Sequence, residues 1–131
     1  MYNESVMELF LYPHNMGKME PADGVGTAGD ARVGDEVTIS IRVEDGRIAD
    51  ARFQALGCGA LIAASSAVTD LAIGRAVDEA LAITEREVLD SLGGLPAQKR
   101  SAAELAPEAL KAAIEDFRRR TRQETADEAP V

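Results

Sequence analysis

The most regular pattern in the chain is an alternation of apolar and polar side chains between residues 37 and 43. Valine and isoleucine occupy the odd positions, and threonine, serine and arginine occupy the even positions. A period of two is typical of a strand that buries one face. Asp45-Gly46 follows and favours a tight hairpin turn, so we predict a returning strand over about residues 47–56. One face of this second strand carries Ala49, Ala51, Phe53 and Ala55.

Helical spacing of apolar residues dominates most of the remaining chain. Asn3 is placed as the N-cap of the first predicted helix. Thr84 and Glu87 form a capping-box pattern, and Gly93-Gly94 closes the helix that this pattern opens. The predicted helices cover residues 3–11, 60–73, 77–83, 84–93 and 101–122.

Two segments show neither the alternation of a strand nor the spacing of a helix. Residues 13–35 contain five glycines, and we predict a loop there. Residues 123–131 are acidic and small, and we predict a disordered tail. Pro107 is unfavourable inside the last predicted helix, and the alternative is that the helix restarts there with the proline in its first turn.

Length and composition indicate one domain with a packed core. The chain has 131 residues, of which 46% are hydrophobic, and we assign the domain to residues 1–122. A hairpin among helices indicates an α+β fold. We expect a small antiparallel sheet with helices packed mainly on one of its faces.

The acidic composition argues against several classes of partner. The net charge is −9 at pH 7, whereas proteins that bind duplex nucleic acid present a basic face to the phosphates. We therefore expect neither a nucleic acid nor an anionic membrane as partner. The arginines within residues 118–122 are interpreted as cations that complement the end of the last helix. The first ten residues carry no basic region and no long apolar run, so we expect no signal peptide and no transmembrane segment.

Cys58 is the only cysteine and lies between two glycines, where a predicted strand meets a predicted helix. Glycine permits a sharp turn, and the N–H groups of the following helix favour a thiolate, which is both a nucleophile and a soft metal ligand. A free cysteine also commonly fills core space, and the spacing leaves both interpretations open. A single cysteine forms no internal disulfide, so we expect a cytoplasmic protein.

Residues 50–66 resemble the second-cysteine motif of the IscU and NifU N-terminal family, whose members are scaffolds for iron–sulfur cluster assembly. Other segments align in order: residues 11–17 with the family's N-P-x-N-x-G segment, Gly34-Asp35 with the Gly-Asp after its first cysteine, residues 95–99 with its L-P-P-V-K loop, and residues 105–114 with its closing helix. The resemblance covers roughly residues 2–120 and implies a sheet of about three strands. It also implies a cysteine desulfurase or other iron–sulfur assembly proteins as partners.

This chain departs from the ligand set that the resemblance implies, which is three cysteines and a conserved aspartate. Val33 occupies the first cysteine position, and Ser101 and Ala102 occupy the positions of the family's His-Cys pair. Cys58 and Asp35 remain, and the resemblance implies that these two residues bind iron or a cluster.

The ligand count limits what one chain can hold. A [2Fe–2S] cluster takes four terminal ligands, mostly thiolates, and a structural zinc site takes four, typically Cys and His. Asp35 is equally a candidate for a plain turn residue, and His14, the only histidine, is interpreted as a surface loop residue. We therefore expect a second subunit of a homodimer, a partner protein or glutathione to complete the site of Cys58 and Asp35.

Three functions compete on these grounds. We predict a divergent scaffold-like protein that binds iron or a cluster through Cys58, Asp35 and borrowed ligands. The alternative is a regulatory paralogue that binds no cluster and docks on iron–sulfur or sulfur-transfer machinery; the missing cysteines and the changed loop Ala97-Gln98-Lys99 motivate it. A thiol enzyme would need a base beside the sulfur, which requires the fold to bring His14 to Cys58. We predict no enzymatic activity.

Overall fold

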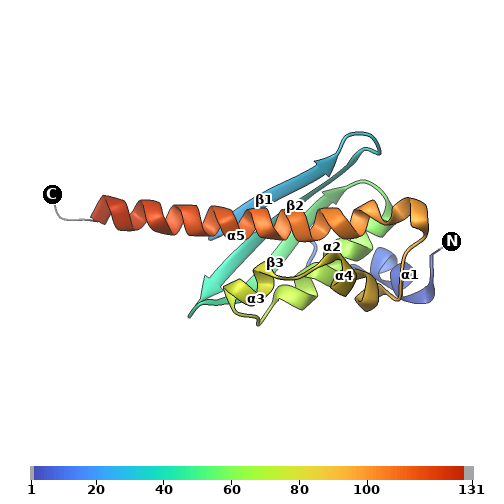
Figure 1. The fold of residues 1–131 in the computed structure, drawn as a ribbon, viewed down its shortest axis with the longest axis horizontal. Coiled ribbons are helices and arrows are strands. Elements are labelled where there is room, and N and C mark those ends of the chain that lie inside the picture. The colour runs from blue at the N-terminus through green and yellow to red at the C-terminus, as the bar shows by residue number, and fades with distance from the viewer. Residues whose placement is uncertain (1, 129–131) are drawn as a thin grey trace.

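A computed structural model describes residues 2–128 and shows a three-stranded antiparallel sheet with helices packed against it (Figure 1). The strands are neighbours in the order β1-β2-β3. The elements are, in chain order, α1 (Glu4–Leu11), β1 (Gly24–Asp30), β2 (Asp35–Glu44), β3 (Arg47–Leu56), α2 (Gly59–Ala72), α3 (Val77–Leu81), α4 (Glu85–Leu92), the 3-10 helix η1 (Ala97–Lys99) and α5 (Ser101–Glu128). α5 lies along β1 and β2, and α2 packs on β3, so the aliphatic core lies between the sheet and these helices. This arrangement confirms the predicted α+β fold.

The hairpin of β2 and β3 follows the predicted alternation of inward and outward side chains, except at one position where the alternation reverses. Its strands and the Asp45-Gly46 turn are confirmed. The register shifts after Arg42, where β3 carries the extra residue Ala49. A β-bulge of this kind reverses which side chains face the core, so Ile48 is fully buried and Ala49 is exposed. The prediction that Ala49 shares a face with Ala51 and Phe53 was wrong, because a strict period of two cannot show a bulge.

The loop predicted over residues 13–35 was wrong in part, because residues 24–30 form β1. The sequence of this strand is Gly-Val-Gly-Thr-Ala-Gly-Asp, which lacks the large apolar residues of an ordinary strand. The physical reason is the close approach of α5. A Cβ atom added to Gly26 would lie 2.2 Å from the backbone nitrogen of Ala113, and one on Gly24 would lie 2.3 Å from the Ala113 carbonyl oxygen. Glycine is therefore required where the helix backbone rests on β1.

β1 forms one edge of the sheet, and α5 caps part of that edge. The N–H of Val25 donates a hydrogen bond of 2.9 Å to Oδ2 of Asp116. Burial raises the pKa of this carboxyl, but the Val25 N–H and the guanidinium groups of Arg120 and Arg119 outweigh burial and hold the pKa below its ordinary value. An edge N–H that is capped in this way is closed to pairing with another chain.

Asp116→Asn is expected to lower the free energy of unfolding at pH 7 by about 1 kcal/mol, because a neutral acceptor replaces a charged one. The folded-state pKa lies below the unfolded one, so this stabilisation is complete above the unfolded pKa of about 3.9 and is lost as the pH falls through the folded pKa. Urea unfolding of the wild type and of Asp116→Asn, at pH 7 and at about pH 3, measures the difference in the free energy of unfolding. The two proteins should differ at pH 7 and converge in acid, and a difference independent of pH would contradict this role.

The starts and ends of the shorter helices agree with the predicted caps. Oδ1 of Asn3 accepts a hydrogen bond of 2.9 Å from the N–H of Val6. Oγ1 of Thr84 accepts one of 3.2 Å from the N–H of Glu87, and Gly93 closes α4 with a φ of 72°. Local capping chemistry therefore places the start of α1 and both ends of α4.

α5 is longer than predicted. It contains Pro107 without interruption, so the alternative of a restart at that residue is wrong. It also continues past residue 122 to Glu128 and projects beyond the sheet (Figure 1). The predicted tail is therefore helical over residues 123–128, while residues 129–131 lie outside the described part of the chain. None of the described helices has both the length and the hydropathy needed to span a membrane.

Candidate functional site

Cys58 connects the end of β3 to the start of α2, as its glycine-flanked position predicts. It occupies the N-cap position of α2 with extended backbone angles, φ −78° and ψ 166°. Its side chain makes no capping hydrogen bond to the helix and is partly buried. The thiol is therefore available to a group outside its own helix.

That group is the carboxylate of Asp35, the first residue of β2. Oδ1 of Asp35 accepts a hydrogen bond of 3.2 Å from the Cys58 N–H, and Oδ2 accepts one of 3.5 Å from Sγ of Cys58. Asp35 is only 5% exposed. The structure thus brings the two predicted site residues into contact, and Asp35 fixes both the backbone and the side chain of Cys58.

Gly57 makes this contact possible. Its φ of 151° is a value that residues with a side chain rarely adopt. A Cβ atom added at this position would lie 2.3 Å from Oδ1 of Asp35. The sequence indicates a glycine for the turn, but the room that it leaves for a carboxylate of another strand is apparent only in the fold.

A cavity of about 110 Å³ opens beside Cys58. It is lined by Val33, Asp35, Gly57, Cys58, Gln98, Lys99 and Ser101. The two positions at which the resemblance places a further cysteine differ in their surroundings, since Val33 is 57% exposed at this cavity whereas Ala102 is 1% exposed and packs in the core. Gln98 and Lys99 were not predicted as site residues, although the resemblance of residues 95–99 to the family's loop is a signal that could have found them.

His14 contacts α2 and lies outside the lining of the Cys58 cavity. Its Nδ1 lies 2.6 Å from Oδ2 of Asp70 on α2, and its backbone N–H donates to Oγ of Ser66 at 3.1 Å. The side chain of Asn15 donates to the same Asp70 carboxylate at 2.8 Å. These contacts attach the segment after α1 to α2, and His14 does not line the Cys58 cavity. It is therefore not placed as the base that a thiol enzyme would need.

The ligating groups at the cavity are one thiol and one carboxylate. Within residues 2–128, no three His, Cys, Asp or Glu side chains are grouped so that they could hold a metal ion. A cluster takes four terminal ligands, mostly thiolates, so the residues of one chain do not fit a complete cluster. What the site can present is one sulfur ligand whose orientation is set by a buried carboxylate.

Comparison with known proteins finds one matching family model and several similar proteins. A family model described as NifU-like N terminal domain matches residues 1–124. The iron–sulfur cluster assembly scaffold protein IscU 1 of Archaeoglobus fulgidus is 49% identical over 120 residues, covering 92% of this chain and 78% of the relative. The scaffold protein IscU of Aquifex aeolicus is 42% identical over 118 residues, covering 88% and 75%. The nitrogen fixation protein NifU of Cereibacter sphaeroides is 44% identical over 115 residues, which are 88% of this chain and 47% of that longer protein.

Solved structures share the fold. A protein of Fervidobacterium islandicum AW-1 assigned to the SUF system of iron–sulfur cluster assembly superposes with a TM-score of 0.73 at 22% identity, covering 86% of this chain and 96% of that chain. The N-terminal part of a NifU-like protein from Brucella abortus superposes with a TM-score of 0.58 at 20% identity, covering 97% and 95%. At these identities the likeness establishes the fold.

Proposed function

Because this chain belongs to the family of NifU-like N-terminal domains, we propose that it acts as a divergent scaffold for iron–sulfur cluster assembly. It holds iron or a cluster as cargo through Cys58 and Asp35. The observation that carries the proposal is the pair of hydrogen bonds between these two residues at the strand–helix turn. The scaffold names of the relatives favour this function over a regulatory paralogue that binds no cluster.

Cys58 supplies the sulfur ligand in this proposal, and Asp35 positions it. A thiol binds metal only after it loses its proton. The proton that Sγ directs to Oδ2 of Asp35 is therefore released when iron binds. Asp35 then keeps its hydrogen bond from the Cys58 N–H, which holds the turn, and its second oxygen becomes free to act as a ligand.

Ligands from outside the chain complete the site. Two exposed apolar side chains lie near Cys58, since Val33 is 57% exposed at the cavity and Leu56, two residues before Cys58, is 74% exposed. A second copy related by a two-fold axis would present the same two apolar side chains and would double the thiol and the carboxylate. A partner protein or glutathione is the other source of ligands. The number of chains per cluster distinguishes these sources.

The remaining roles follow from the scaffold function. A cysteine desulfurase or another iron–sulfur assembly protein is the partner class, because a scaffold needs a source of sulfur. The protein binds and passes on its cargo and is not itself an enzyme. We place it in the cytoplasm, where a lone cysteine remains reduced.

Anaerobic reconstitution with ferrous iron and sulfide tests this function. The wild-type protein is expected to retain both and to show visible charge-transfer absorbance, and Cys58→Ala is expected to lose both because it removes the only sulfur ligand of the chain. Iron, sulfide and chain mass are measured on the same sample by chemical analysis and native mass spectrometry. One cluster per two chains would identify a second copy as the source of the missing ligands.

Cys58→Ser is the matched control, because its hydroxyl keeps a donor for Asp35 while the sulfur is removed. It should unfold at the same urea concentration as the wild type and still retain little iron. Wild-type protein that holds neither iron nor sulfide would refute the scaffold function and favour the non-binding paralogue.

A further inference from the structure

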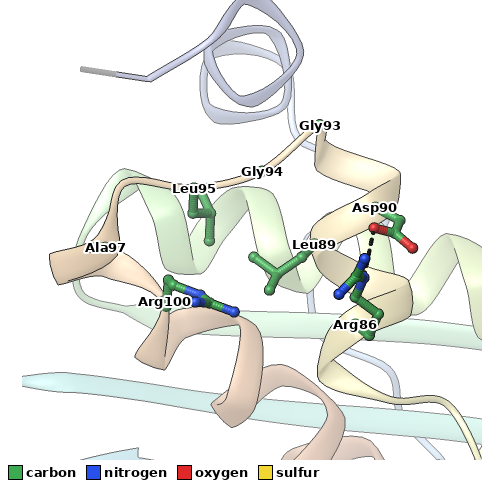
Figure 2. A pocket seen from close by; sticks show the side chains of 8 residues that line it. All are labelled: Arg86, Leu89, Asp90, Gly93, Gly94, Leu95, Ala97 and Arg100. Atoms are coloured by element: carbon green, nitrogen blue, oxygen red, sulfur yellow. Dashed lines mark hydrogen bonds and ion pairs between the residues drawn. The ribbon is translucent and has the colours of Figure 1, made fainter.

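A second cavity, of about 610 Å³, lies between α4 and the segment that leads to α5 (Figure 2). It shares no lining residue with the Cys58 cavity. We call it the Arg86–Arg100 groove. Its lining residues are Arg86, Leu89, Asp90, Gly93, Gly94, Leu95, Ala97 and Arg100.

The groove combines an apolar base with two cations. Leu89 is 8% exposed at its base, and Leu95 packs partly buried against the core. Figure 2 shows the side chains of Arg86 and Arg100 on either side of Leu89, one from α4 and one from the residue before α5. A ligand that lies on the two leucines therefore meets a guanidinium group from each wall.

The wall formed by residues 93–95 is held in place by hydrogen bonds to Asn3 and to the end of α4. The side chain of Asn3 donates to the carbonyl oxygens of Leu92 at 2.9 Å and Gly94 at 3.3 Å. The Gly94 N–H donates to the Leu89 carbonyl at 2.9 Å, which closes α4. A groove that is formed before binding avoids much of the entropy cost of ordering its walls.

The two cations are available to a ligand. Arg86 pairs with Asp90 at 3.2 Å, and their side chains are 82% and 69% exposed. Arg100 lies 3.9 Å from Glu85, close to the limit for an ion pair. Exposed pairs of this kind contribute little to stability, so an incoming carboxylate can replace either acid at little cost. Among residues 2–128, the backbone N–H of Leu95 also has no partner.

We propose that the Arg86–Arg100 groove docks an extended peptide segment that carries acidic side chains beside aliphatic ones. Guanidinium groups bind carboxylates through paired, charge-assisted hydrogen bonds, and aliphatic side chains cover Leu89 and Leu95. The net charge of −9 repels the dense charge of a polyphosphate chain more strongly than a peptide with isolated carboxylates, so the peptide suits the groove better than a nucleic acid. This site is independent of Cys58 and of the scaffold function.

The test is a titration of the full chain, followed by NMR of its backbone amides. The probe is the peptide Leu-Glu-Leu-Asp-Leu, acetylated and amidated so that its side chains carry its only charges. The control peptide is Leu-Gln-Leu-Asn-Leu. The acidic peptide is expected to shift the amides of residues 86–100, and the neutral peptide is expected to bind at least about tenfold more weakly, or about 1.4 kcal/mol.

The double variant Arg86→Gln, Arg100→Gln should weaken the acidic peptide by a similar factor. Both side chains are exposed, so the variant should fold as the wild type does. Arg52→Gln is the matched control, because Arg52 is another exposed arginine paired with an aspartate, at 3.3 Å from Asp50. Equal binding of both peptides, unchanged binding to the double variant, absence of shifts in residues 86–100, or equally effective displacement by inorganic phosphate would each overturn the proposal.

Discussion

Replacing Gly26 with alanine is expected to lower the free energy of unfolding by roughly 3 kcal/mol or more. The added Cβ would lie 2.2 Å from the backbone nitrogen of Ala113 and 2.5 Å from the carbonyl oxygen of Ala109. These are backbone atoms of a helix, so they cannot move aside as a flexible side chain would. Relief of the collision requires α5 to lift from β1, which exposes the core between them. A native state is stable by only about 5–15 kcal/mol, so the loss is a large fraction of the total.

Urea unfolding of the wild type and of two alanine variants measures this effect. Gly29→Ala is the matched control, because Gly29 lies on the same strand and a Cβ there would meet its nearest atom at 3.3 Å, the Asp35 carbonyl oxygen. We expect a change within about 1 kcal/mol for this control, in the range of an ordinary Gly to Ala exchange. Similar losses for Gly26→Ala and Gly29→Ala would show that α5 does not rest on the backbone of β1.

β1 also marks the limit of what the sequence could predict about the fold. The hairpin, the caps at Asn3 and Thr84 and the order of the helices depend on local patterns, and these were predicted. β1 depends on a helix far away in the chain, which selects glycine where an isolated strand would select branched apolar residues. The bulge at Ala49 is likewise a break in the pairing with β2 that no local period reveals. The extension of α5 to Glu128 lies beyond the sheet, in a segment whose acidic composition indicated a tail.

The sequence named Cys58 and Asp35 as candidate site residues but did not show how they are arranged. Cys58 and Asp35 were named from the family resemblance, and the fold places them in contact. The residue spacing could not show the contact of Asp35 with Cys58, because it joins the start of β2 to the turn between β3 and α2. It also could not show that Ser101 lines the cavity while Ala102 is buried, since neighbouring positions of a helix point in different directions.

Val33 occupies the position at which the family resemblance places a first cysteine. It lines the same cavity as Cys58 and Asp35. An apolar side chain that is 57% exposed there is better suited to contact another protein surface than to bind a metal. The substitution therefore agrees with a site that is completed from outside the chain.

Gly57→Ala is expected to separate Asp35 from Cys58 and to abolish the retention of iron. The new Cβ would lie 2.3 Å from Oδ1 of Asp35, the oxygen that accepts the Cys58 N–H. The φ of 151° adds strain of about 1–3 kcal/mol. Because Asp35 is 5% exposed, its carboxylate has little room to retreat and must leave either the hydrogen bond or its buried position. We expect a total loss of roughly 3 kcal/mol in the free energy of unfolding.

Gly34→Ala is the control for this substitution. Gly34 also has a positive φ, 73°, but a Cβ there meets no atom within 4 Å, so only the strain of the backbone remains, about 1–2 kcal/mol. The amide resonance of Cys58, recorded without iron, reports its hydrogen bond to Asp35, and it should move in Gly57→Ala and stay in place in Gly34→Ala. After anaerobic reconstitution, Gly57→Ala should retain little iron, whereas Gly34→Ala should retain about as much as the wild type. If the two variants behaved alike, the carboxylate would not be the group that positions Cys58, and the turn alone would determine the site.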